Sequence, residues 1–106
     1  MVHKPRRLPG VPQAPRYIRR TDPTTGIAFV FKTDSDAPDM LHIYARHLTT
    51  AEDAMTVFRE GEPPVWDATH RRFETYTATH GLYWFWLEPG SVVMVVSCFR
   101  EEGDAD

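Results

Sequence analysis

The sequence predicts an α+β domain: one main helix packed on a small antiparallel sheet of about four strands, preceded by an extended Pro-rich N-terminal arm. Three observations lead to this prediction. Residues 49–60 show the pattern of an amphipathic helix, the segment after them is rich in β-branched and aromatic residues, and residues 1–25 contain five prolines. With 106 residues, of which 42% are apolar, the chain can build one core but not two comfortable domains.

The segment 1–25 is expected to be extended, because proline lacks the amide donor that a helix needs. Its first 20 residues contain six Lys or Arg and no acid, whereas residues 101–106 contain four acids. We therefore divide the chain into a basic Pro-rich arm at 1–25, a single α+β domain at 26–100 and an acidic tail at 101–106. Such an arm can contact nucleic acid, an acidic partner or the protein's own acidic surface.

The domain is expected to begin with a short strand at Ile27–Lys32, which is β-branched and aromatic. Residues 33–38 form a polar loop. Met40–Leu48 stays open between helix and strand, although Pro38 and the flanking acids suit a helix start. His42 and Arg46 share a face in either case, since a spacing of four is about one helical turn and also an even number of strand positions.

The main helix is predicted at Thr49–Glu60. Thr49 and Glu52 have the spacing of a capping box, and apolar residues recur at i, i+3, i+4 and i+7 from Ala51, so one face should be buried. Gly61 is expected in the left-handed conformation just beyond the helix, and the two prolines that come after it prevent its continuation.

Strand-like runs come after the helix. They are Val65–Asp67, Arg72–Thr79, Leu82–Leu87 and Val92–Phe99. Turns are expected at His80-Gly81 and at Glu88-Pro89-Gly90, which would join the last three runs into a meander. The final run is apolar on both faces and is therefore expected at the centre of the sheet.

His42 and Arg46 are the first candidates for chemistry. An imidazole titrates near neutral pH, so His42 can take a proton from a ribose 2′-hydroxyl or give one to a leaving oxygen. Arg46 can hold a phosphate and stabilise the charge of the transition state. The structural alternative is a half-buried histidine bonded to a backbone carbonyl, beside a surface arginine.

A second candidate group lies in the strand that begins at Arg72. Alternation places Arg72, Glu74 and Tyr76 on one face, where they could act as charge clamp, carboxylate base and phenol donor. An ordinary polar face with a cross-strand ion pair is the alternative. Ser97, in the last strand, can donate to a phosphate oxygen. Four further arginines are expected to bind nucleic acid: Arg16, Arg19, Arg20 and Arg71.

Several functional classes lack support in the sequence. The histidines do not have the spacing of a metal motif and no Gly-rich phosphate loop is present, so we expect no metal and no cofactor. The lone cysteine, Cys98, excludes an internal disulfide and favours a reducing compartment. The N-terminus lacks the apolar segment of a signal peptide, and no apolar run can span a bilayer. We expect a cytoplasmic protein without a membrane partner.

From His42 to Phe99 the chain resembles the small toxin-like nuclease domains of the barnase–EndoU–colicin–RelE superfamily, and it is most similar to the prokaryotic and phage members related to BrnT-type toxins. The matching features are His42, Arg46, the helix Thr49–Glu60 with Gly61, the basic strand at Arg72, and the terminal strand VVMVVSCF with Ser97. The resemblance implies a metal-independent endoribonuclease that leaves a cyclic phosphate and is neutralised by an antitoxin.

The leading hypothesis, a small toxin-like endoribonuclease, gives roles to five residues. His42 would be the general base or acid, and Arg46 and Arg72 would bind the scissile phosphate. Tyr76 or Ser97 would assist as a donor.

One departure from that family supports an alternative. Outside the first 20 residues the chain has six basic and 15 acidic residues, whereas RNA-cleaving toxins are usually basic. The alternative is a non-enzymatic interaction module, such as a phage or mobile-element regulator or inhibitor, that uses the acidic tail and the aromatic run Tyr83–Trp86. The same run could stack RNA bases or form the interface of a homodimer.

Overall fold

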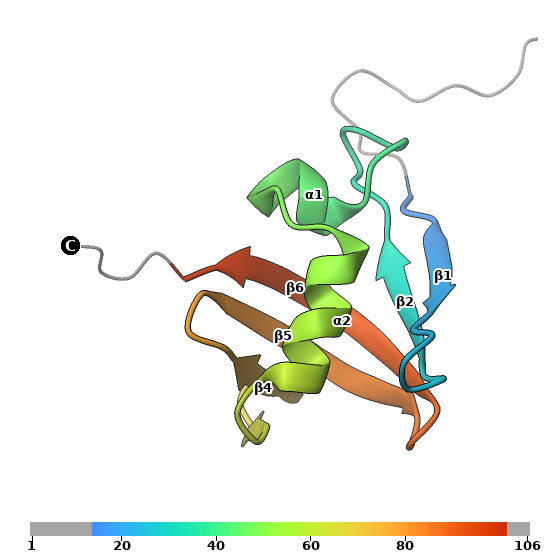
Figure 1. Cartoon of the computed structure of the whole chain (residues 1–106). Coiled ribbons are helices and arrows are strands. Elements are labelled where there is room, and N and C mark those ends of the chain that lie inside the picture. Colours follow the sequence, from blue (N-terminus) through green and yellow to red (C-terminus); the bar gives the residue numbers. More distant parts are fainter. Residues whose placement is uncertain (1–13, 102–106) are drawn as a thin grey trace, which may run out of the picture.

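Six strands and two short helices make up residues 14–101, the part of the chain that the computed structural model describes (Figure 1). In chain order they are β1 (Tyr17–Thr21), β2 (Ala28–Lys32), α1 (His42–His47), α2 (Ala51–Glu60), β3 (Val65–Asp67), β4 (Arg72–Tyr76), β5 (His80–Glu88) and β6 (Val92–Arg100). The strands form one sheet in the order β1-β2-β6-β5-β4-β3.

The expected architecture of one main helix on an antiparallel sheet of about four strands is wrong. The sheet has six strands and is mixed, because β2 runs parallel to β6 while the other neighbours are antiparallel, and a second helix, α1, precedes α2. The parallel pair joins distant parts of the chain, so no local pattern signals it. The extra edge strand, β1, lies inside the Pro-rich segment, whose composition conceals it.

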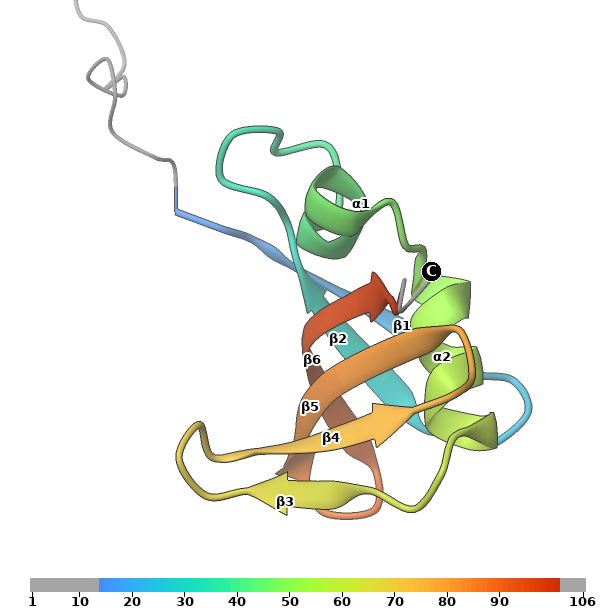
Figure 2. The same ribbon diagram turned by 90° about the vertical axis from the view of Figure 1, so that its left-hand side faces the viewer.

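Both helices pack on one side of the strongly curved sheet, with α2 across its middle strands and α1 beside β6 (Figure 2). Alternation along the strands sends the largest buried side chains to that side. They include Phe29, Phe31, Leu82, Trp84, Val93, Val95 and Cys98. Among residues 14–101 no helix covers the opposite face, which we call the open face. The central position predicted for the last strand is confirmed, since β6 lies between β2 and β5.

The capping box of α2 lies one residue later than predicted. Thr50 accepts from the amide of Asp53, and the Asp53 carboxylate accepts from the amide of Thr50. Thr49 is instead fully buried and donates its hydroxyl to the carbonyl of Cys98 at 2.7 Å. A tertiary hydrogen bond to β6 therefore decides which of two adjacent threonines caps the helix.

Gly61 ends α2 as predicted, but not in the left-handed conformation, since its φ is −75°. It is required for close packing. A Cβ at this position would lie 2.5 Å from Cγ2 of Thr75 and 2.7 Å from the carbonyl oxygen of Val57. The end of α2 can approach β4 only because residue 61 has no side chain.

Gly61→Ala is accordingly expected to lower the free energy of unfolding by roughly 1–3 kcal/mol, the usual range for an overpacked site. Urea unfolding measures this loss, and Glu60→Ala, at the exposed last position of α2, is the matched control. Equal stability of Gly61→Ala and the wild type would contradict the close approach.

Three further predictions concern the segment Met40–Leu48 and the turns on either side of β5. Met40–Leu48 contains α1, which ends where Leu48 adopts a left-handed φ of 58°. The predicted turn at Glu88–Gly90 is confirmed, and Gly90 there has a φ of +80°. The predicted turn at His80-Gly81 is wrong, because both residues belong to β5 and the chain reverses just before them.

None of the helices in residues 14–101 is long and apolar enough to cross a membrane.

Candidate functional site

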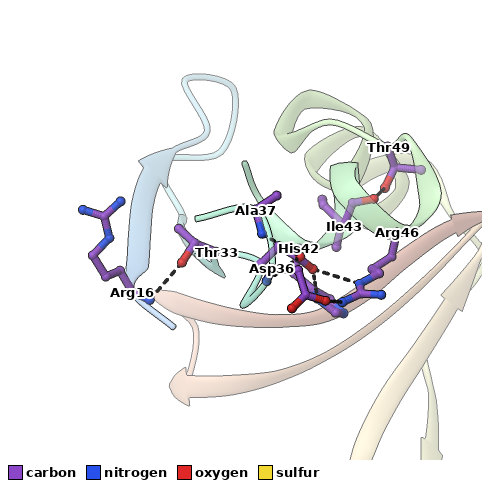
Figure 3. A network of polar contacts seen from close by, with 9 residues as sticks. Arg16, Thr33, Asp36, Ala37, His42, Ile43, Arg46 and Thr49 are labelled. Atoms are coloured by element: carbon purple, nitrogen blue, oxygen red, sulfur yellow. Dashed lines mark hydrogen bonds and ion pairs between the residues drawn. The ribbon is translucent and has the colours of Figure 1, made fainter. Parts of the chain in front are cut away.

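Asp34 organises the loop between β2 and α1 and brings His42 and Arg46 together. Its side chain is only 2% exposed. One carboxylate oxygen accepts from the backbone amides of Asp36 at 3.0 Å and Ala37 at 3.1 Å, which fixes the loop. The other oxygen bonds to Nδ1 of His42 at 3.1 Å and accepts from Nε of Arg46 at 2.9 Å (Figure 3).

This arrangement suits a base better than a phosphate clamp. With Nδ1 of His42 on the carboxylate, Nε2 is the ring nitrogen left to exchange a proton. Arg46, however, also donates to the Asp36 carboxylate at 3.0 Å. Two carboxylates therefore neutralise this guanidinium, and their charge opposes an incoming phosphate. We call Asp34, Asp36, His42 and Arg46 the Asp34 cluster.

The protein is expected to lose stability in acid through Asp34. Burial raises the pKa of this carboxyl, but the hydrogen bonds from Arg46, the Asp36 amide and His42 outweigh it and hold the pKa below the ordinary 3.8. The unfolded chain therefore takes up protons first as the pH falls, so the free energy of unfolding should drop below about pH 4 and not above it. Asp34→Asn should reduce the fall in the free energy of unfolding between pH 6 and pH 3, which urea titrations at pH 6, 4 and 3 measure. An unchanged dependence on pH would contradict the role given to Asp34.

A second polar group lies on the open face, on β4. Phe73 and Thr75 point toward the helices, so alternation places Arg72, Glu74 and Tyr76 together on the open face. Glu74 accepts from Nη2 of Arg72 at 3.2 Å and from the Tyr76 hydroxyl at 3.0 Å. We call these three residues the Glu74 cluster.

Neighbouring strands complete the surroundings of the Glu74 cluster. The Arg72 guanidinium lies 3.6 Å from the centroid of the Tyr83 ring on β5, a cation–π contact that holds it over the sheet. Ser97 of β6 stands opposite Tyr83 in the register, and so on the same face. Burial, with hydrogen bonds to Tyr83 and Glu74, raises the pKa of Tyr76, so its phenol stays protonated and able to donate.

Asp67 of β3 adds a second carboxylate to this face. It lies 3.9 Å from Nη2 of Arg72 and 2.8 Å from Nδ1 of His70. The hydrogen bond from His70 lowers the pKa of Asp67 to about 2. Asp67 is therefore a fixed negative charge that helps to orient Arg72.

The five residues predicted as catalytic thus fall into two groups. His42 and Arg46 belong to the Asp34 cluster, whereas Arg72, Tyr76 and Ser97 share the open face. No hydrogen bond or ion pair within residues 14–101 joins the two groups.

His47, one of the histidines that lack the spacing of a metal motif, borders the open face. Its ring centroid lies 6.1 Å from that of Phe99, which lies 5.0 Å from that of Tyr83. The exposed imidazole of His47 therefore begins a row of three neighbouring rings. The last of them, Tyr83, contacts Arg72 of the Glu74 cluster. The position of His47 after Arg46, at the end of α1, gave no sign of this in the sequence.

The four arginines predicted to bind nucleic acid do not form one surface. Arg16 donates to the Pro38 carbonyl, and Arg20 lies 3.9 Å from the Glu52 carboxylate on the helix side of the sheet. Arg19 points to the open face at the far edge, and Arg71 lies in the β3–β4 turn. Residues 1–13, with the rest of the basic arm, and 102–106, with most of the acidic tail, lie outside the described part.

Residues 14–101 contain no group of three or more His, Cys, Asp or Glu side chains placed to hold a metal ion. Comparison with protein-family models, with curated proteins and with solved structures found no match to this chain. The chemistry of this protein is therefore inferred from the geometry of the Asp34 cluster and of the Glu74 cluster.

Proposed function

We propose that this protein is a small, metal-independent endoribonuclease that acts on the open face of its sheet, with Glu74 as the general base. One observation carries the proposal. The Glu74 carboxylate is bonded at once to a guanidinium and to a phenol, on a face that no described helix covers, and the Arg72 and Glu74 side chains are 18% and 20% exposed.

These groups supply what cleavage of RNA needs. The Glu74 carboxylate takes the proton of the ribose 2′-hydroxyl as that oxygen attacks the phosphorus. Arg72, already held over Tyr83, moves its donors to the non-bridging phosphate oxygens and stabilises their charge, and the phenol of Tyr76 adds a hydrogen bond. The bond to the 5′-oxygen breaks, and the products are a 2′,3′-cyclic phosphate and a 5′-hydroxyl.

The leaving 5′-oxygen needs a proton, and residues 14–101 contain four imidazoles. His70 is bonded to the Asp67 carboxylate and His80 to the Thr79 hydroxyl. His47 stands beside Phe99 at the border of the open face, whereas His42 belongs to the Asp34 cluster. We assign the proton donor to His47, because its exposed ring has no carboxylate partner within residues 14–101, and an RNA chain lying over Tyr83 and Phe99 would bring its 5′-oxygen to this imidazole.

The test is cleavage of total RNA by the purified protein in EDTA, with analysis of the new ends. Metal-independent cleavage that leaves cyclic phosphates supports the proposal. Loss of cleavage in His47→Ala but not in His42→Ala assigns the proton donor, and the reverse result would move the chemistry to the Asp34 cluster. A folded wild type that cleaves no RNA would contradict the proposal.

A second candidate, a non-enzymatic interaction module, is favoured by an apolar hollow elsewhere on the open face. The hollow has a volume of about 340 Å³, and its lining is Tyr17, Val30, Phe85, Leu87 and Met94. Leu87 is 50% exposed and Tyr17 58%. An antitoxin, another protein or a second copy of the chain would find contact area here. Pull-down and light scattering test this candidate if cleavage fails.

We also propose a cytoplasmic location. It is supported by the single cysteine, Cys98, a buried free thiol that leaves the chain without an internal disulfide.

A further inference from the structure

A second hollow lies where β5 runs past β4. The pairing of these strands begins at Phe73 opposite Trp84, yet β5 continues to Glu88, so its last four residues have no partner on that side within residues 14–101. The hollow in this gap has a volume of about 710 Å³, which is within the usual range of small-ligand sites. Its lining residues are Trp66, Arg71, Phe73, Phe85 and Trp86.

The lining combines aromatic faces with a single charge, and that charge is positive. Trp66 is 51% exposed, although its ring packs against Phe73 with centroids 4.9 Å apart. Four aromatic side chains thus line a space that is open to solvent. None of the lining residues is acidic, in contrast to the Asp34 cluster and the Glu74 cluster.

Arg71 is the most unusual residue of this hollow. Its backbone has a φ of +58°, a conformation that residues other than glycine rarely adopt, and its amide donates to the Asp67 carbonyl at 2.7 Å to close the turn. Within residues 14–101 its side chain makes no hydrogen bond or ion pair, whereas the adjacent Arg72 is paired with Glu74. The turn therefore presents an unneutralised guanidinium at the hollow.

We infer that this hollow is a subsite for one base of a single-stranded nucleic acid, in which the base stacks on the Trp66 ring and Arg71 binds the adjoining phosphate. Aromatic faces bind bases of any sequence, and a nearby cation holds the backbone. An acidic peptide would satisfy the guanidinium but would leave the aromatic faces without a flat partner. Trp66 stands opposite Phe73 and so on the helix side, so a bound strand would pass round the free edge of β5 to reach the Glu74 cluster. The inference deepens the proposed function by naming how the RNA is held, but it does not require cleavage.

The test separates binding from cleavage by using a fluorescein-labelled single-stranded oligodeoxynucleotide, which lacks the 2′-hydroxyl. Fluorescence polarisation at low salt should show binding by the wild type. Trp66→Ala should weaken it about 5-fold or more. Arg71→Ala should weaken it and should reduce the slope of log K against log salt concentration by about one phosphate contact. Arg100→Ala, at an exposed position opposite His80 and so at the other end of β5, should bind like the wild type, and circular dichroism checks each fold.

Each outcome bears on the inference separately from the nuclease proposal. Wild-type affinity in both Trp66→Ala and Arg71→Ala would overturn the inference even if the protein cleaves RNA. Loss of binding in both variants would support it even if no RNA is cleaved. Poly-glutamate at equal charge concentration is the competitor. If it displaces the oligonucleotide, and if Trp66→Ala binds the oligonucleotide like the wild type, the site recognises negative charge alone. That result would also overturn the inference.

Discussion

Glu74→Gln is expected to lower the rate of RNA cleavage by roughly 10²–10⁴-fold while the protein stays folded, the usual cost of losing a general base. The amide has nearly the shape of the carboxylate, and its oxygen can accept from Arg72 while its NH2 group donates to the Tyr76 hydroxyl oxygen, but it cannot take the 2′-hydroxyl proton. Glu74 is half-buried at the surface of β4 and not in the core, so a large loss of stability is not expected. Cleavage of a defined RNA in EDTA, monitored over time, measures the effect.

One control variant and one further test variant make this result specific. Glu88→Gln removes an exposed carboxylate from the end of β5 and should leave the rate unchanged. Arg72→Lys keeps the positive charge but loses the planar guanidinium, and it should slow cleavage while Glu74 stays in place. A Glu74→Gln protein that cleaves at the wild-type rate would remove Glu74 from the mechanism and leave the Asp34 cluster as the site to test.

Trp84→Ala is expected to have the largest effect on stability, a loss of about 3–5 kcal/mol in the free energy of unfolding. Trp84 is 2% exposed, and its ring contacts those of Phe58, Phe73 and Trp86 with centroids 4.8–5.1 Å apart. Its indole N–H also donates to the buried hydroxyl of Thr75 at 2.9 Å. Truncation therefore opens a cavity and leaves that hydroxyl without its partner.

Because a domain of this size is stable by only about 5–15 kcal/mol, such a loss would unfold a large fraction of the molecules near physiological temperature. Urea unfolding of Trp84→Phe, which keeps part of the ring contacts but not the hydrogen bond, gives a second measurement if Trp84→Ala does not fold. Trp66→Ala, at a half-exposed site, is the matched control and should lose much less. Equal losses for Trp66 and Trp84 would contradict the packing described for α2.

Part of the candidate site could be predicted from local patterns. The even spacing of Arg72, Glu74 and Tyr76 in a strand put them on one face, and the structure brings all three into contact. The pairing of His42 with Arg46 likewise came from their spacing, but their shared partner did not. Asp34 precedes them in a polar loop, and only its burial distinguishes it from its exposed neighbour Asp36.

The sequence by itself determined the local elements of this protein. The spacing of apolar residues fixed α2, and the β-branched and aromatic runs fixed β2 and the strands after α2, because these signals depend only on neighbours in the chain. Tertiary structure decided the rest: the parallel pairing of β2 with β6, the edge strand β1, the use of Thr50 rather than Thr49 as the cap, and the place of His47 beside the open face. Each of these depends on contacts between residues far apart in the chain, whose free energy no local pattern records.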